Sequence, residues 1–178
     1  MVKDQNFTEE VLPIESVAEY FEHFSLLEID YTFYRPLLES NENPSLNYRV
    51  LKNYRQQMKK GDLLLLKAPQ IIIARKLKRG PAFAENADYL NAEIFIKQFY
   101  RPAVEILGSR LNGIIFEQEY HVKNNRVPIS KLAQDLDEFF GKIPKDNRYH
   151  IELRTEAYWV TPVFDVLKKH GVGLVFSH

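Results

Sequence analysis

The chain has 178 residues, of which 45% are apolar, so it is long enough to bury the core of one domain. Its 24 lysines and arginines balance 24 aspartates and glutamates, which excludes a generally basic nucleic-acid binder. Because cysteine is absent, disulfides, thiolate nucleophiles and cysteine-ligated metal centres are excluded as well. No apolar run approaches the roughly 20 residues that a membrane helix needs. We therefore expect a cytoplasmic protein that binds neither membranes nor nucleic acid.

Hydrophobic periodicity divides the chain into alternating helices and strands after a polar leader over residues 1–14. Apolar side chains three or four residues apart predict five helices: residues 15–24, residues 46–60, and three more that begin near Leu90, Ser130 and Thr161 and end at Gly108, Gly141 and Gly171. Alternation of period two, or a short apolar run, predicts five strands: residues 26–34, 63–68, 114–120, 149–154 and 172–176.

The periodic pattern is interrupted at two places, and each interruption predicts a local structure. Residues 76–86 are polar, contain Gly80 and Pro81 and lack either period, so we expect a loop inserted between a strand and a helix. Pro102 lies inside the third helical segment and is expected to kink or restart it. Five strands that alternate with five helices require parallel pairing through right-handed crossovers, which makes residues 15–178 one α/β domain.

Charged side chains on the predicted strands favour one kind of α/β fold. Parallel strands that are covered by helices on both faces should be almost uniformly apolar. Here Glu28 and Asp30 share one face of the first strand, Lys67 ends the second, and Glu152 and Arg154 share one face of the fourth. In a barrel, one face of the sheet points to the axis, where acids and bases from neighbouring strands can meet. We therefore predict a partial (β/α) TIM-type barrel with about five parallel strands, open rather than closed.

The same residues are the candidate site, since barrel enzymes assemble their sites at the carboxyl ends of the strands. We assign catalytic roles to Glu28, Lys67, Glu152 and Arg154, and substrate binding to Asp30, Tyr34 and Gln118. The two cations would hold an anionic or electron-rich group, and one of the carboxylates would act as general base or acid. The alternative is a structural ion-pair network that plugs the barrel.

A metal site is a weaker hypothesis. Glu117, Glu119 and His121 alternate along the third strand and could converge on a divalent ion, but solvated charges at a strand end are the favoured interpretation. No metal and no cofactor is assigned.

Four ordered motifs resemble the signatures of a known family of TIM-barrel proteins, the domain of unknown function 72 or YecE-like family. They are Glu28–Tyr34, Leu66–Pro69, Phe116–Gln118, and Glu152–Arg154 with Trp159. The resemblance implies an eight-stranded barrel with the motif residues near its mouth, and an activity that is not established. The chain departs from the family at Ile73 and Ala74, where a Thr-His pair is usual, and at Thr155, where a histidine is common. A mechanism that uses those histidines is therefore not implied here.

By this resemblance, the five strands correspond to the second through sixth strands of the family. A fragment that lacks the first strand and the last two would expose two parallel edges, which invite self-association or pairing with a partner chain. The function expected is an acid/base enzyme, of hydrolase, isomerase or lyase type, that acts on a small polar or anionic molecule. A noncatalytic binding or scaffold module and an inactive truncated gene product remain the alternatives, so whether the protein is an enzyme stays open.

Overall fold

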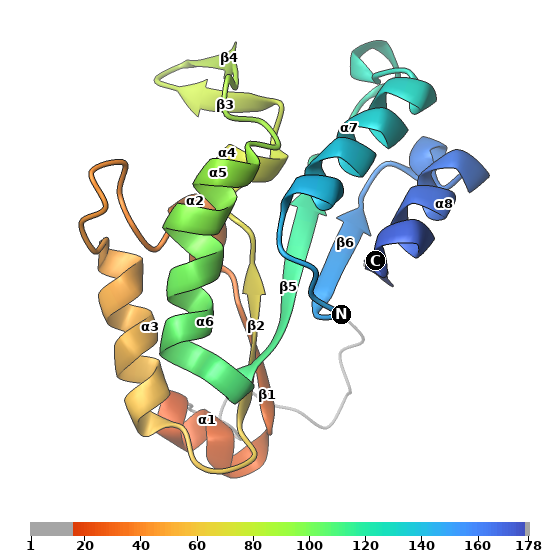
Figure 1. The fold of residues 1–178 in the computed structure, drawn as a ribbon. Helices are drawn as coiled ribbons and strands as arrows, with labels where there is room; N and C mark the ends of the chain where they lie inside the picture. The colour runs from red at the N-terminus through yellow and green to blue at the C-terminus, as the bar shows by residue number, and fades with distance from the viewer. Residues whose placement is uncertain (1–15, 177–178) are drawn as a thin grey trace, which may run out of the picture.

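Five parallel strands form one sheet in the order β1-β2-β5-β6-β7 in the computed structural model, which describes residues 16–176 (Figure 1). The strands are β1 Leu26–Ile29, β2 Leu63–Lys67, β5 Leu111–Gln118, β6 Tyr149–Leu153 and β7 Gly173–Val175. All four neighbouring pairs are parallel, and β1 and β7 are the edges of the described sheet. The open partial barrel predicted from the sequence is therefore confirmed. The predicted leader over residues 1–14 lies outside the described residues.

Helices connect the strands and surround the outside of the sheet (Figure 1). The α-helices are α1 Val17–His23, α2 Tyr31–Tyr34, α3 Leu46–Gln57, α4 Gln70–Ile73, α5 Ala92–Ile94, α6 Arg101–Leu107, α7 Ile129–Lys142 and α8 Thr161–His170. A π-helical segment, Phe95–Tyr100, joins α5 to α6, and single 3₁₀ turns occupy Gly108–Arg110, Lys123–Asn125 and Glu156–Tyr158. Gly171 ends α8 in the left-handed conformation, at φ 67° and ψ 31°, as its position after the helical pattern predicts.

The hydrophobic core lies between the sheet and the helices. Leu64 and Leu66 on β2 and Phe116 on β5 are completely buried there. The ring of Phe116 contacts three rings of the helical layer at centroid distances of 5.3–5.6 Å: Phe95, Phe139 and Phe140. Burial of each such side chain contributes about 1.5–3 kcal/mol. Since side chains alternate along a strand, Lys67 and Glu117 point to the opposite, inner face of the sheet.

The first strand is shorter than its alternating pattern predicts. It ends at Ile29, and residues 31–34 form the short helix α2 instead of continuing the strand. The side-chain hydroxyl of Thr32 donates to the backbone carbonyl of Lys67 at 2.8 Å and lies 3.2 Å from that of Ile29. These contacts fold the chain across the end of β2. The prediction of a strand over residues 26–34 was therefore wrong in its second half.

The segment predicted as a loop forms an antiparallel hairpin instead, with strands β3 Lys76–Arg79 and β4 Ala82–Glu85. Leu77 lies opposite Ala84, and the ammonium of Lys76 lies 3.3 Å from the carboxylate of Glu85. The side-chain amide of Asn86 holds the base of the hairpin, since it donates to the carbonyls of Ile71 and Ala74 at 2.7 Å each. Figure 1 shows the hairpin projecting beyond the carboxyl ends of the strands.

Pro102 changes the helix around it, as the sequence predicts, but it does so through a π-helical segment. Proline has no amide hydrogen, and its ring clashes with the carbonyl four residues earlier in an α-helix, which is that of Gln98. The π-helical segment Phe95–Tyr100 immediately precedes this region. The Gln98 carbonyl instead accepts backbone hydrogen bonds from Leu37 and Leu38, at 3.1 and 2.9 Å. A helix interior thereby fixes the loop that follows α2.

Candidate functional site

Lys67 brings together carboxylates from three regions at the carboxyl ends of the strands. Its ammonium nitrogen lies 2.6 Å from Glu117 Oε2, 3.1 Å from Asp30 Oδ1 and 3.2 Å from Glu28 Oε1. Glu28 lies on β1, Asp30 follows that strand, and Glu117 lies on β5, so β2 places the lysine between the two neighbouring strands. The predicted convergence of strand charges on one face is present.

Glu117 extends this group of charges to β6. Its second carboxylate oxygen accepts a hydrogen bond from Arg154 at 2.9 Å, and Arg154 Nε lies 3.8 Å from the carboxylate of Glu152. Residues 117 and 152 are direct cross-strand partners in the parallel register. We call these six residues the strand-end cluster: Glu28, Asp30, Lys67, Glu117, Glu152 and Arg154.

The members of the strand-end cluster differ in their exposure to solvent. The side chains of Lys67 and Glu117 are only 15% and 14% exposed, whereas that of Asp30 is 72% exposed. Arg154 and Glu28 are about half exposed, and Glu152 is buried. A ligand that approaches from solvent therefore meets Asp30, Glu28 and Arg154 before it meets the inner pair.

The protonation of Lys67 follows from its surroundings. Burial lowers the pKa of the ammonium, but hydrogen bonds to Glu117, Asp30 and Glu28 outweigh burial and raise the pKa above its usual value. Lys67 therefore remains a cation at neutral pH. This charge state suits electrostatic stabilisation and disfavours the neutral amine that Schiff-base chemistry needs.

Two of the sequence-predicted substrate residues lie apart from the strand-end cluster. Tyr34 ends α2, is largely exposed and packs its ring against that of Phe33 at 5.5 Å. Gln118 follows Glu117 on β5, so its side chain points to the opposite face of the sheet, where it is 99% buried. Neither its amide oxygen nor its amide nitrogen has a hydrogen-bond partner among the described residues. The structure thus brings five of the seven predicted site residues together.

Sequence reasoning missed two residues of the inner face. Glu117, which lies in the Phe116–Gln118 motif but was named individually only as a metal ligand, bridges Lys67 and Arg154. Its position one residue from Gln118 could have placed it on the charged face, because strand side chains alternate. The second residue is His150 on β6, which lies opposite Ile115 on β5 and Gly173 on β7.

The ring of His150 lies close to two glycines. A Cβ added to Gly173 on β7 would lie 2.5 Å from the His150 ring, and one added to Gly113 on β5 would lie 3.3 Å from its Nδ1. Nδ1 lies 2.9 Å from the carbonyl of Arg148, which can only accept a hydrogen bond. Nδ1 is therefore the donor in this hydrogen bond. No local sequence pattern reveals this arrangement, since it depends on cross-strand register.

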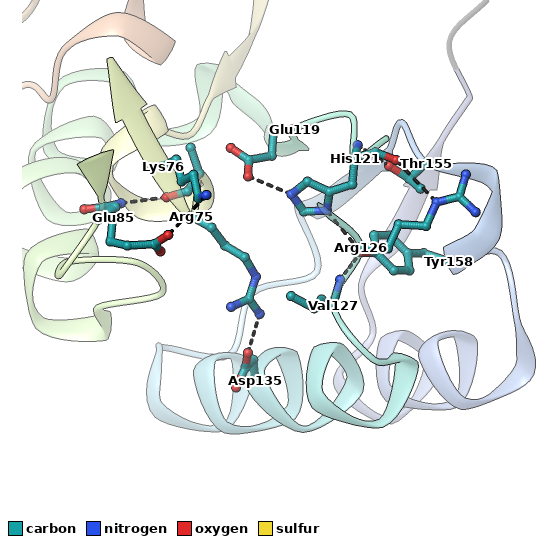
Figure 2. A network of polar contacts seen from close by, with 12 residues as sticks. Arg75, Lys76, Glu85, Glu119, His121, Arg126, Val127, Asp135, Thr155 and Tyr158 are labelled. Carbon is teal, nitrogen blue, oxygen red and sulfur yellow. Dashed lines mark hydrogen bonds and ion pairs between the residues drawn. The ribbon is translucent and has the colours of Figure 1, made fainter. Parts of the chain in front are cut away.

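The proposed metal ligands form a different structure. Because β5 ends at Gln118, the alternation that would align Glu117, Glu119 and His121 stops, and only the last two contact each other, at 2.6 Å between Glu119 Oε1 and His121 Nε2 (Figure 2). Within residues 16–176, no three side chains of the metal-ligating types are arranged to hold an ion. His121 is buried, so the solvated interpretation does not describe it either.

The buried histidine anchors the loop between β5 and α7 (Figure 2). His121 Nδ1 lies 3.1 Å from the hydroxyl of Tyr158, which accepts a hydrogen bond from the backbone amide of Val127 at 3.0 Å. The backbone amide of His121 donates to the hydroxyl of Thr155 at 2.8 Å. The carboxylate of Glu119 can only accept, so Nε2 is the donor in the hydrogen bond between these two side chains. The loop beside the strand-end cluster is thus held by side chains from β6's carboxyl end.

None of the helices in residues 16–176 combines the length and the apolar character that crossing a membrane requires.

Comparisons with known proteins identify the fold and the family. The model of the family described as "Protein of unknown function DUF72" matches residues 2–178. Two crystal structures of a DUF72 family protein from Enterococcus faecalis V583 are similar to this chain: one at 17% identity and a TM-score of 0.55, covering 89% of this chain and 52% of that one, and the other at 15% identity and a TM-score of 0.52, covering 89% and 57%. No curated protein matches.

These comparisons support the barrel interpretation of the open sheet. At such low identity, the two crystal structures show the fold alone, and their DUF72 fold is TIM-like. The chain spans little more than half the length of either one. The family model, in contrast, covers nearly the whole sequence, including every residue of the strand-end cluster. The chain belongs to the DUF72 family.

Proposed function

We propose that the strand-end cluster is the ligand site of this protein and that it binds a small polar molecule for acid/base chemistry. The observation that carries the proposal is the Lys67 ammonium, held within 3.2 Å of carboxylates from both neighbouring strands at the carboxyl end of a parallel sheet. Sites of TIM-type barrels form at this end because residues from several strands converge there.

Five members of the strand-end cluster have a chemical role in this proposal, and the sixth, Glu117, positions Lys67 and Arg154. Lys67 stays protonated and stabilises negative charge that develops on a bound group. Glu152, buried beside Arg154, is the general acid or base, and half-exposed Arg154 binds an electron-rich group of the ligand. Exposed Asp30 and Glu28 accept hydrogen bonds from the ligand. Four carboxylates face two cations, so the site favours neutral polar ligands over strongly anionic ones.

A specific observation favours a second candidate, the noncatalytic ion-pair network. Three carboxylates of the protein lie within 3.2 Å of the Lys67 ammonium, which matches its three N–H donors without a ligand. In this case the strand-end cluster would fix the relative positions of β1, β2 and β5 and would take no part in binding.

An NMR screen separates the two candidates. Amide chemical shifts of the full chain are recorded against sugars, hydroxy acids and amino acids, and any ligand found is followed for turnover. We expect shifts near residues 28–30 and 152–154 that are lost in Asp30→Asn and in Glu152→Gln, with Lys52→Met on exposed α3 as the control. Because Asp30 is largely exposed, its substitution leaves the fold intact. Ligand shifts that both site variants retain would remove the strand-end cluster from the function.

A further inference from the structure

Two aromatic side chains form an exposed platform at the ends of β6 and β7. Trp159 is 40% exposed and Phe176 is 69% exposed, although aromatic residues of this size are usually buried. Their ring centroids lie 5.5 Å apart at an interplanar angle of 75°. The indole N–H of Trp159 donates to the carbonyl of Leu153 at 2.7 Å, so the orientation of its ring is fixed before any ligand arrives.

The platform lies beside the strand-end cluster. Leu153, which holds the indole, is the residue between Glu152 and Arg154. Phe176 directly follows Val175, and Val175 is the cross-strand partner of Glu152. The loop that carries Trp159 is itself fixed, since the Trp159 amide donates to the carbonyl of Glu156 at 2.9 Å and the preceding Tyr158 is completely buried. The Trp159 ring is therefore held against the strand that carries Glu152, and Phe176 lies at the end of the neighbouring strand.

The aromatic platform and the strand-end cluster together favour one class of small polar ligand. Each hydroxyl group both donates and accepts, so a polyol can use the carboxylates as acceptors and the Arg154 guanidinium as donor. A cationic group offers no acceptor to Arg154, which then keeps only its contacts with Glu117 and Glu152, whereas an anion faces the excess of carboxylates. A sugar ring also has a face of C–H groups that packs against an aromatic ring, and exposed apolar surface beside convergent polar groups is typical of ligand sites.

We propose that the ligand of the strand-end cluster is a carbohydrate, that Trp159 stacks against its apolar face, and that Phe176, whose ring stands at 75° to the indole, contacts the edge of the sugar. The inference rests on the proposed function and adds the class of ligand and two binding residues to it. Trp159 is the single tryptophan of the chain, so its fluorescence reports directly on this surface.

The test is a fluorescence titration of the full chain with D-glucose, D-galactose, D-xylose and cellobiose. We expect at least one of them to change the Trp159 emission saturably. Phe176→Ala, which removes half of the platform, and Asp30→Asn, which removes a hydrogen-bond acceptor, should each weaken that binding by about tenfold. Both residues are largely exposed, so both variants keep the fold. Phe164→Ala, at an exposed aromatic residue of α8, is the matched control and should bind as the parent does.

The outcomes distinguish this inference from the function on which it rests. If none of the four sugars changes the emission, or if the change persists in Phe176→Ala, the carbohydrate inference is overturned. Citrate and choline are then titrated while amide shifts are recorded. A shift at residues 28–30 and 152–154 that Asp30→Asn abolishes would leave the site in place with a different ligand class, and the absence of any shift would overturn both proposals.

Discussion

Replacement of Lys67 by methionine tests the electrostatic reasoning most directly. The substitution keeps most of the side-chain volume but removes the cation that Glu117, Asp30 and Glu28 surround. Removal of one partner from a buried ion pair costs about 3–5 kcal/mol, while an exposed pair contributes about 0–1 kcal/mol. Only Glu117 is shielded, and it keeps Arg154 at 2.9 Å, so we expect Lys67→Met to lower the free energy of unfolding by about 2–3 kcal/mol.

Urea unfolding at neutral pH measures this loss, with Lys52→Met on the exposed surface of α3 expected to change stability by no more than about 0.5 kcal/mol. Because Lys67 and Glu117 lie 2.6 Å apart, the double variant Lys67→Met with Glu117→Gln should lose about 1–2 kcal/mol less than the two single losses together. Strict additivity, or a Lys67→Met loss no larger than that of the control, would refute the reasoning.

The difference in stability between the parent and Lys67→Met should depend on pH in a definite direction. The pKa of Lys67 is raised in the folded protein, so its contribution to stability is fully present below the unfolded value of 10.5 and is lost as the pH rises beyond it. The difference in stability between the parent and Lys67→Met should therefore shrink in alkaline solution above that value. A stability difference that grows in alkaline solution would contradict the contacts assigned to Lys67.

Three further predictions concern other parts of the fold. Gly173→Ala should cost about 1–3 kcal/mol, because its Cβ would lie 2.5 Å from the neighbouring imidazole, whereas Gly141→Ala on α7, with 3.8 Å to the nearest atom, should not destabilise; thermal unfolding in the opposite order would contradict this packing. Tyr158→Phe should cost about 1–3 kcal/mol and accelerate hydrogen exchange at the Val127 amide, and unchanged exchange would argue against the hydroxyl as its acceptor. Burial raises the pKa of Asp146, but hydrogen bonds from Arg148 outweigh burial and hold the pKa below 3.8. The stability that Asp146→Asn loses relative to the parent should therefore shrink as the pH falls below that value. A loss that grows in acid would refute the assignment.

The sequence predicted the sheet well because burial dictates its strands. Leu64 and Leu66 are apolar because they are buried against the helices, and Glu28 with Lys67 marks the opposite face of the sheet. The residue at which a strand ends was harder to predict. Tyr31 and Thr32 have the residue types of a strand, yet the Thr32 hydroxyl reaches the carbonyl of residue 67, and no local pattern records that distant acceptor.

The candidate site was predictable in its charges and less so in its geometry. Alternation alone separates Gln118 from Glu117, so the amide could have been assigned to the helical layer from the sequence. The exposed hairpin of β3 and β4 has too few apolar side chains to show a period, with Leu77 and Ala84 as its one apolar cross-strand pair. The proximity of the two glycines to His150 could not be predicted, because it depends on the register of three strands, which a single sequence does not contain.

The π-helical segment before Pro102 couples two distant parts of the chain. A residue with an amide hydrogen at position 102 would compete for the Gln98 oxygen that now receives the amides of Leu37 and Leu38. Straightening this helix would therefore release the segment that follows Asp30 and α2. A substitution at Pro102 should therefore loosen this segment, whereas most substitutions at Leu37 keep the backbone amide that donates to Gln98, so a proline in the helical layer helps to fix the loop that follows α2.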